Sequence, residues 1–221
     1  MAAGALALAL LGGITTATRP ANAETVADAG TAAMASKVIE RLNATLLKIM
    51  QNADRLGYAG RYAEMAPTVS ESFDIAYMAE QAAGSYWKSL TEAQRKSLAD
   101  AFDRFTIASY AARFNGYSGQ KFVVLGEAPG AANSMMVRNQ LVKGNGEAIS
   151  IDYALKQNSE KWRIVDVYLK GRFSELAVRR GEYTSAIKSQ GISYLIEQIE
   201  GRVNALRDQA AAKEEEKKAA Q

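Results

Sequence analysis

The stretch KWRIVDVYLKGRFSELAVRRGEY, residues Lys161–Tyr183, contains the pattern that decides the fold. Its first nine residues alternate with the period of a strand, and Gly171 separates them from an amphipathic helix. Strict alternation puts Trp162, Ile164, Asp166 and Tyr168 on one face and Val165, Val167 and Leu169 on the other. Both faces are then largely apolar, so we expect the strand to be covered on both sides. A carboxylate inside it, Asp166, needs hydrogen-bond donors.

Three further segments with a period of two precede this strand. The four strand-like segments are 121–125, 134–143, 147–156 and 161–169, separated by short turns at 128–130, 144–146 and 157–160. Short connections between successive strands predict an antiparallel meander. In the third segment the side chains of Ile149, Ile151, Tyr153 and Leu155 share one face and those of Ser150, Asp152 and Lys156 the other. One side of the sheet is therefore buried there.

Helical stripes of apolar residues flank the strands on both sides. The predicted helices are 24–55, 70–83, one that begins at Thr91 and ends at Asn115-Gly116, and two that meet at Gly191. Gly57 is a stop signal for the first, and the Thr91–Gln94 spacing is that of a capping box. We predict an α+β fold: an antiparallel sheet of four or more strands wrapped by N- and C-terminal helices. Residues 24–206 form one domain, and the charged tail 207–221, with no apolar stripe, is expected to be flexible.

The N-terminus has the pattern of a secretory signal. Ala2–Ile14 is an almost continuous apolar run, and Ala21-Asn22-Ala23 before Glu24 has the small-residue spacing of a signal-peptidase site. The run is shorter than the roughly 20 apolar residues that a membrane-spanning helix needs. It departs from the usual pattern in one respect, because no basic residue precedes Arg19. We expect residues 1–23 to be removed and a soluble protein to be exported.

The composition excludes several classes of function. The 221 residues include neither Cys nor His, which removes thiol nucleophiles, Ser-His-Asp triads, histidine general bases and the usual zinc sites. The net charge of +3 falls to +2 without Arg19, too small a surplus to predict nucleic-acid binding. A chain that is 48% hydrophobic is an ordinary globular protein, and it must be stabilised by a core because no disulfide is possible.

Several short motifs resemble those of the MlaC family, periplasmic lipid carriers of Gram-negative bacteria. The matching residues are Phe73-Asp74, Met78, Tyr86-Trp87, Gln94-Arg95, the helix with Phe102, Phe105 and Tyr110, then Tyr117, and finally Trp162 and Asp166. The resemblance covers 24–206. The run Gly171–Arg180 departs from the phospholipid carriers and is more similar to HpnM, the hopanoid-associated branch. That branch implies a rigid polycyclic triterpenoid in place of a two-tailed phospholipid.

The resemblance implies a carrier that binds a membrane lipid in an apolar cavity between sheet and helices. It implies two partners, an inner-membrane transport complex and an outer-membrane acceptor, with transient contact to the membrane surface, and neither catalytic groups nor cofactors. We expect the lipid-binding residues to be the large apolar and aromatic side chains of the inward faces: Phe73, Tyr77, Trp87, Phe102, Phe105, Tyr110, Val123, Leu125, Val137, Ile149, Ile151, Tyr153, Leu155, Phe173 and Leu176.

Other interpretations of these residues stay open at the level of sequence. Periodicity does not distinguish a cavity wall from a filled core, so the chain could also be an adaptor without ligand. Asp166 and Asp74 could serve an enzyme as acid or base, as could a Tyr. The simpler interpretation makes Asp166 an acceptor for backbone donors or for Arg95, Arg179 or Arg180, and Asp74 a helix-start acceptor.

The signal sequence generates the first prediction. The mature protein isolated from its native host is expected to begin at Glu24, because signal peptidase cleaves after the small residue of an A-x-A site. N-terminal sequencing of protein from the periplasmic fraction measures this. A mature chain that retains Leu6–Leu11 would contradict export by this route.

Overall fold

The structure, a computed structural model, describes residues 23–158 and 161–219. The predicted signal peptide, residues 1–23, lies outside these residues except for Ala23. The elements in chain order are α1 (Ala23–Gln51), α2 (Ala53–Ser72), α3 (Ile75–Ala83), η1 (Gly84–Ser89), α4 (Glu92–Arg113), β1 (Lys121–Pro129), η2 (Ala131–Asn133), β2 (Met135–Val142), β3 (Ala148–Asn158), β4 (Lys161–Leu169), β5 (Phe173–Ser174) and α5 (Glu175–Ala219). Within the described ranges, no helix is both long and apolar enough to cross a membrane.

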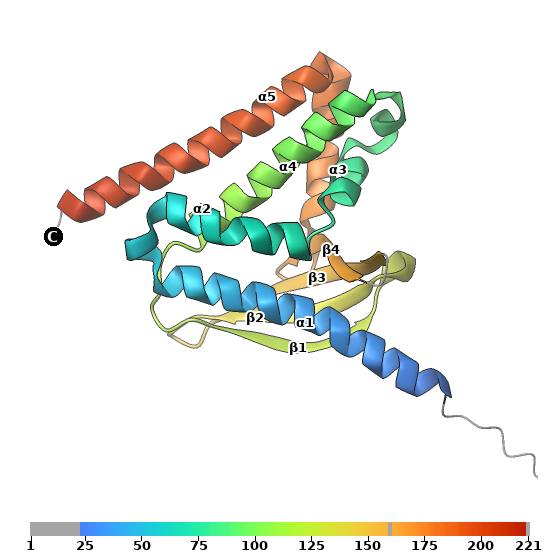
Figure 1. Cartoon of the computed structure of the whole chain (residues 1–221), viewed down its shortest axis with the longest axis vertical. Coiled ribbons are helices and arrows are strands. Elements are labelled where there is room, and N and C mark those ends of the chain that lie inside the picture. The colour runs from blue at the N-terminus through green and yellow to red at the C-terminus, as the bar shows by residue number, and fades with distance from the viewer. Residues whose placement is uncertain (1–22, 159–160, 220–221) are drawn as a thin grey trace, which may run out of the picture.

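The five strands form one antiparallel sheet in the order β1-β2-β3-β4-β5. This confirms the predicted meander and the α+β class. In Figure 1 the helices lie on one side of the sheet, with α1 next to it and α2, α4 and the second half of α5 further out. The short β5 was not anticipated: Phe173 and Ser174 fold back on Leu169 and Tyr168 before α5 begins.

A β-bulge in β4 corrects the strict alternation expected for that strand. Ala154 pairs with Asp166 and Leu155 with Ile164, so Val165 is the extra residue. A bulge changes the face of every side chain beyond it. Val167 and Leu169 therefore share a face with Tyr153 and Ile151, whereas on the other side of the bulge Ile164 and Trp162 occupy that face. Alternation alone does not reveal where the extra residue lies.

The pairing of β1 with β2 corrects the inward positions predicted for that strand, and a second bulge follows at Leu125. Phe122 pairs with Leu141 and Val124 with Asn139, which places Phe122 and Val124 on the helix-covered face. Val123 pairs with Gln140 and has the opposite orientation. Leu125 is skipped by the register and is 52% exposed. The predicted segment 121–125 was too short to fix the phase of the strand, which extends to Pro129.

The helical layer supplies most of the core. The stripe predicted for the first helix, Val38, Ile39, Leu42, Leu46, Ile49 and Met50, is buried as expected. Gly57 and Gly191 leave the helical conformation with φ of 59° and 85°, a region that glycine adopts without steric cost. The predicted interruption at Gly191 is confirmed, and Figure 1 shows α5 changing direction between its two halves. The first helix ends at Gln51, earlier than the predicted Arg55, and Gly57 instead interrupts α2.

The start of α4 confirms the predicted capping box. The Gln94 N–H donates to Thr91 Oγ1 at 3.2 Å, and the Thr91 N–H donates to Gln94 Oε1 at 2.9 Å. Two otherwise unpaired donors of the first turn are satisfied in this way. The helix ends at Arg113, two residues before Asn115.

The charged tail differs from expectation, because α5 continues to Ala219. The guanidinium of Arg61, only 2% exposed, donates to Glu214 Oε1 at 3.2 Å and to the carbonyls of Ala111 at 2.9 Å and Ala53 at 3.1 Å. Ala210 packs nearby against Tyr58. A buried arginine on α2 thus holds the tail to the helical layer, a contact that the absence of an apolar stripe could not reveal.

The second prediction tests this contact. Replacing Glu214→Gln removes the one carboxylate that Arg61 contacts in the described chain, so the free energy of unfolding in urea should fall by about 1 kcal/mol. Glu216→Gln, an exposed site on the same helix, is the matched control and should change it by less than about 0.5 kcal/mol. Equal stability of the two variants would contradict a stabilising role for the Arg61–Glu214 pair.

Candidate functional site

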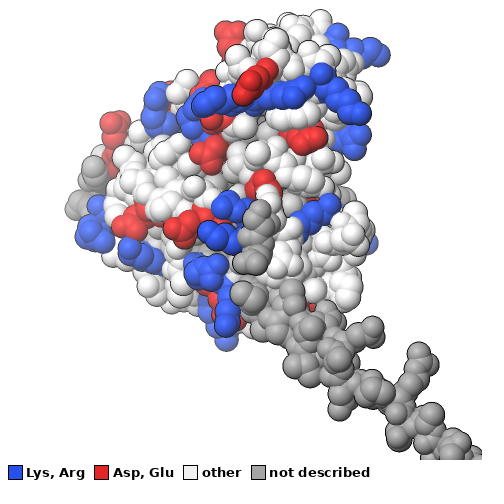
Figure 2. Space-filling view, turned by 45° about the vertical axis from the view of Figure 1, so that its right-hand side comes forward, with Lys and Arg blue, Asp and Glu red and all other residues white. Residues whose placement is uncertain are grey.

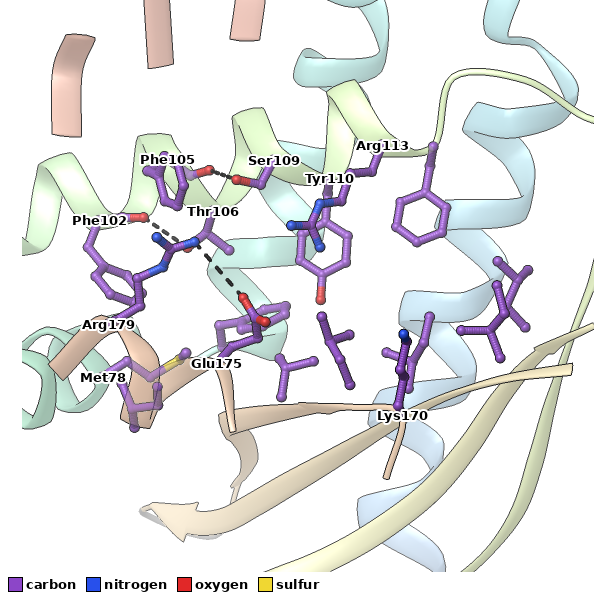
Figure 3. Close-up of a pocket in the computed structure, with 18 residues that line it drawn as sticks. Met78, Phe102, Phe105, Thr106, Ser109, Tyr110, Arg113, Lys170, Glu175 and Arg179 are labelled. Atoms are coloured by element: carbon purple, nitrogen blue, oxygen red, sulfur yellow. Dashed lines mark hydrogen bonds and ion pairs between the residues drawn. The ribbon is translucent and has the colours of Figure 1, made fainter. Parts of the chain in front are cut away.

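A cavity of about 390 Å³ lies between α4, the inner face of the sheet and the first turns of α5. It is partly open to solvent and falls within the size range of small-molecule and cofactor pockets. Eighteen residues line it: Phe73, Met78, Phe102, Phe105, Thr106, Ser109, Tyr110, Arg113, Phe114, Leu141, Ile149, Ile151, Val167, Leu169, Lys170, Glu175, Leu176 and Arg179 (Figure 3).

Helix α4 provides the longest wall. Its lining residues follow the i, i+3, i+4 spacing of one helical face: Phe102, Phe105, Thr106, Ser109, Tyr110 and Arg113. The two hydroxyls on this face are bound internally, since Thr106 Oγ1 donates to the Phe102 carbonyl at 2.8 Å and Ser109 Oγ donates to the Phe105 carbonyl at 2.7 Å. With their donors used by the helix backbone, these two residues add little polarity to the cavity.

The opposite wall is the inner face of the sheet. Leu141 of β2, Ile149 and Ile151 of β3, and Val167 and Leu169 of β4 contribute it. These residues are cross-strand neighbours: Leu141 pairs with Ile149, and Ile151 pairs with Leu169. The bulge at Val165 is what turns Val167 and Leu169 toward the cavity. The sheet wall is therefore aliphatic.

Charged side chains line the cavity only along its edge. Arg179 lies 4.6 Å from the Phe105 ring centroid and forms ion pairs with Glu182 at 3.2 Å and Glu175 at 3.9 Å. Arg113 comes from the last turn of α4, and Lys170 from the turn between β4 and β5. Since Arg113 and Lys170 are exposed and also line the cavity, they mark where it meets solvent.

Asp166 joins the sheet to the start of α5. Its carboxylate is 8% exposed and accepts hydrogen bonds from the Val167 N–H at 2.7 Å, the Leu176 N–H at 3.0 Å and Ser174 Oγ at 2.6 Å. This agrees with the structural interpretation of Asp166, although its donors are backbone and serine groups. Two of the three arginines considered as donors have other partners: Arg179 binds the two glutamates, and Arg95 donates to the carbonyls of Trp87 and Lys88.

Seven of the residues proposed as lipid contacts line the cavity together: Phe73, Phe102, Phe105, Tyr110, Ile149, Ile151 and Leu176. They come from α4, β3, α5 and the junction between α2 and α3, so the fold brings together positions more than 100 residues apart. Tyr110 illustrates the environment, since burial raises the pKa of its hydroxyl to about 12. This phenol remains neutral near pH 7 and is unsuited to act as a general base there.

The other eight lie outside the cavity. Val137, Tyr153 and Leu155 are fully buried in the core beside it, and Val123, Leu125 and Phe173 face away or into solvent, Phe173 being 60% exposed. Tyr77 is packed beneath Lys156, whose Nζ lies 4.9 Å from the ring centroid, and Trp87 beneath Arg95 at 5.5 Å. These two aromatics make cation–π contacts within the protein.

Eleven lining residues were not among the proposed contacts. Helical spacing from Phe102 would have found Thr106 and Arg113. Alternation could not have assigned Val167 and Leu169, because the bulge at Val165 determines which face they occupy. Lys170, Glu175 and Arg179 have no such signal, because the turn after β4 and the direction of α5 determine where they point.

A second hollow, of about 620 Å³, is polar. It lies on the other side of Phe73 and is lined mainly by charged and small residues, among them Asp74, Asp100, Asp103, Lys161 and Arg163. Asp74 caps α3, accepting from the Tyr77 N–H at 3.2 Å, as expected of a helix-start acceptor. No group of three potential metal ligands occurs in residues 23–158 and 161–219. The smaller apolar cavity is therefore the better ligand site.

The fold and this cavity define a class: an α+β protein in which helices and an antiparallel sheet enclose an apolar cavity. Comparison with known proteins then gives the family, since the model of the MlaC protein family matches residues 40–201. The chain belongs to the MlaC family.

Two relatives are informative. The chain is 27% identical over 187 residues to the intermembrane phospholipid transport system binding protein MlaC of Haemophilus influenzae, covering 83% of this chain and 85% of that protein. The solved structure of a phospholipid-binding protein from Ralstonia solanacearum, in complex with a phospholipid, has the same fold. It gives a TM-score of 0.68 at 18% identity and covers 78% of this chain and 98% of that one.

The third prediction concerns Asp166. Asp166→Asn keeps the shape and the acceptor for the Val167 and Leu176 amides but turns an N–H₂ group toward Ser174, so the free energy of unfolding should fall by about 1–3 kcal/mol. Thermal and urea unfolding measure the change. Asp208→Asn, at an exposed carboxylate of α5, is the control. If both variants were as stable as wild type, Asp166 would not be the anchor of α5.

Proposed function

We propose that this protein is a periplasmic lipid carrier that binds a membrane lipid in the cavity between α4 and the sheet. The observation that carries the proposal is the chemistry of the cavity. Twelve of its eighteen lining residues are apolar or aromatic, and the polar ones are concentrated at the solvent-facing edge or bonded to their own helix. An amphiphile fits this distribution, with its apolar body inside and its headgroup at the edge.

The relatives support the same function. The Haemophilus influenzae protein is described as a binding protein of a phospholipid transport system, and the Ralstonia solanacearum structure holds a phospholipid. Membership of the family, together with a cavity of suitable chemistry, favours lipid binding by this chain too. The signal-like N-terminus, with its A-x-A site, supports export to the periplasm.

The cargo has two candidates within this function. The named relatives favour a phospholipid. The run Gly171–Arg180 resembles the HpnM branch and favours a hopanoid, a rigid polycyclic lipid. This run includes Leu176 and Arg179, which line the cavity. A preference for one of the two lipids would therefore depend on residues that contact the bound lipid.

A carrier needs partners at both membranes, which we propose to be an inner-membrane transport complex and an outer-membrane acceptor. On the face in Figure 2, acidic and basic side chains are interspersed over the helices. Such a mixed surface suits transient protein contacts more than a nucleic acid, which selects dense positive charge. The small net charge of +3 agrees with this distribution.

An enzyme is the alternative from another class, and the contacts of the candidate acids weigh against it. Asp166 is occupied by three structural hydrogen bonds and Asp74 by a helix cap. The hydroxyl of Tyr110, whose pKa is raised by burial, is neutral near pH 7, and Glu175, the acidic side chain among the lining residues, forms an ion pair with Arg179 at 3.9 Å. We therefore propose that the protein binds lipid without chemical conversion. An adaptor without ligand is disfavoured by the volume of the cavity.

Identification of co-purified lipid tests the proposal most directly. Protein purified from its native periplasm is expected to carry a phospholipid or hopanoid, detected by native mass spectrometry and identified after extraction. The lipid should be recovered unchanged after prolonged incubation. Protein that is free of lipid and does not take up any from vesicles would overturn the carrier function, and conversion of the ligand would favour the enzyme.

The fourth prediction fills the cavity. Ile151→Trp adds an indole to the inner face of β3, where free volume exists, so bound lipid per protein should fall by at least about half while the fold is retained. Val123→Trp adds the same group on the opposite face of β1 and should leave the lipid content unchanged. Lipid phosphorus or extracted lipid mass, with circular dichroism as the folding control, measures both.

The same pair of variants distinguishes a cavity from a filled core. In a filled core, Ile151→Trp would cost about 1–3 kcal/mol or more of unfolding free energy through overpacking. A large loss of stability with unchanged lipid content would contradict the assignment of this cavity as the lipid site.

A further inference from the structure

Two basic side chains at the edge of the cavity have no acidic partner in the described part of the chain. Arg113 of α4 and Lys170 of the β4–β5 turn both line the cavity, and neither forms an ion pair with a carboxylate of residues 23–158 or 161–219. They belong to opposite walls. In Figure 3, Lys170 extends upward from the sheet and Arg113 extends from α4 beside Tyr110, both into the space between the walls.

Arg179, the third basic residue that lines the cavity, does have acidic partners. Arg179 is paired with Glu182 and Glu175, and Glu175 is the one acidic side chain among the lining residues. Because Glu175 lies with Arg179, it does not neutralise Arg113 or Lys170. The edge of the cavity near the end of α4 therefore carries two positive charges that form no ion pair within residues 23–158 and 161–219.

Two like charges directed at one apolar space repel each other, and the repulsion grows where water is displaced by a ligand. A neutral cargo would displace that water and provide no counter-charge. An anionic group between the two side chains would compensate both. Arg can hold a phosphate or carboxylate with two parallel hydrogen bonds, and Lys supplies a mobile point charge.

The backbone at Lys170 supports a role for its side chain. Lys170 has a φ of 52°, in the left-handed region where glycine and asparagine are the common residues. The turn is fixed around it, since the Lys170 N–H donates to the Ser150 carbonyl at 3.0 Å and the Arg172 N–H donates to the Leu169 carbonyl at 3.2 Å. A glycine would adopt this conformation at lower cost. The lysine adds a positive charge aimed at the cavity.

We propose that Arg113 and Lys170 form a subsite for the anionic headgroup of the lipid. This inference rests on the proposed carrier function and names its cargo class: an amphiphile with an apolar body and a negatively charged, phosphate- or carboxylate-bearing headgroup. The apolar body occupies the space between α4 and the sheet, and the headgroup lies at the edge between the two cations. An uncharged polycyclic lipid would leave both charges uncompensated and is the disfavoured cargo.

The fifth prediction tests the headgroup subsite with short-chain lipids added as monomers, so that no membrane surface is present. Delipidated wild-type protein is titrated calorimetrically with dihexanoyl phosphatidylglycerol and with dihexanoyl phosphatidylcholine, which have the same chains. We expect tighter binding of the anionic lipid. Arg113→Gln combined with Lys170→Gln should weaken binding of phosphatidylglycerol about 5- to 10-fold and change that of phosphatidylcholine less than about twofold.

Two matched variants control for net charge and for shape. Lys121→Gln with Arg138→Gln removes the same charge from exposed sites on β1 and β2 outside the cavity and should leave both affinities unchanged. Arg113→Lys with Lys170→Arg retains both positive charges and should retain the preference for the anionic lipid. Added salt should weaken the preference in wild type, because these charges are exposed.

The remaining outcomes separate the two proposals. Equal affinity of wild type for the two lipids, or a preference that the glutamine pair leaves intact, would overturn the headgroup subsite while the carrier function stood. Failure to bind either lipid, together with the absence of co-purified lipid, would overturn the carrier function itself. Binding of inorganic phosphate alone with the same dependence on Arg113 and Lys170, and no gain from acyl chains, would identify a free-anion site and also overturn the proposal.

Discussion

The geometry of the cavity depends on the three hydrogen bonds that the Asp166 carboxylate accepts. They bind the end of β4, the two residues of β5 and the first turn of α5 to one buried acceptor. Every charged residue at the edge of the cavity except Arg113 lies within this connected region, on the turn that carries Lys170 or on the first turns of α5. The position of α5 relative to the sheet, and with it one side of the cavity, is set here.

The cavity stays open because each of its walls is held in place by contacts with parts of the protein that do not line the cavity. Helix α4 packs against α5 and α2, and α2 in turn holds the tail of α5 through the buried Arg61. On the sheet side, the walls are defined by the register of β2, β3 and β4. Close packing is the usual state of a protein interior, so a space of this volume requires walls that are held by contacts elsewhere. A chain without disulfides achieves this through its helical layer and one buried cation.

Much of this architecture could be predicted from the sequence. The apolar stripe of α1, the capping box of α4 and the glycine interruptions at Gly57 and Gly191 are local features, and local patterns determine them. The meander followed from short turns between strands. The two bulges could not be predicted, because one extra residue leaves the composition of a strand unchanged and alters only its pairing. The proposed contact Val123 falls on the outer face because the segment 121–125 alone did not fix which residues of β1 point inward. Lys170 and Arg179 depend on the course of the chain after the sheet, which no periodicity encodes.

If the cavity holds a lipid as proposed, the bonding of Thr106 and Ser109 to carbonyls of their own helix has a consequence for how that lipid leaves. With these donors used internally, the α4 wall offers a ligand contact area but little directional bonding, so an acyl chain can slide along it without first breaking a fixed set of bonds. The free energy lost then rises in steps of about 0.8 kcal/mol per CH₂ group returned to water. If an acceptor provides an apolar surface next to the opening, each CH₂ group that leaves the cavity is buried again on that surface, and the free energy of exposing it to water is recovered. Transfer can therefore proceed as a gradual hand-over, with no point at which the whole lipid must be free in water.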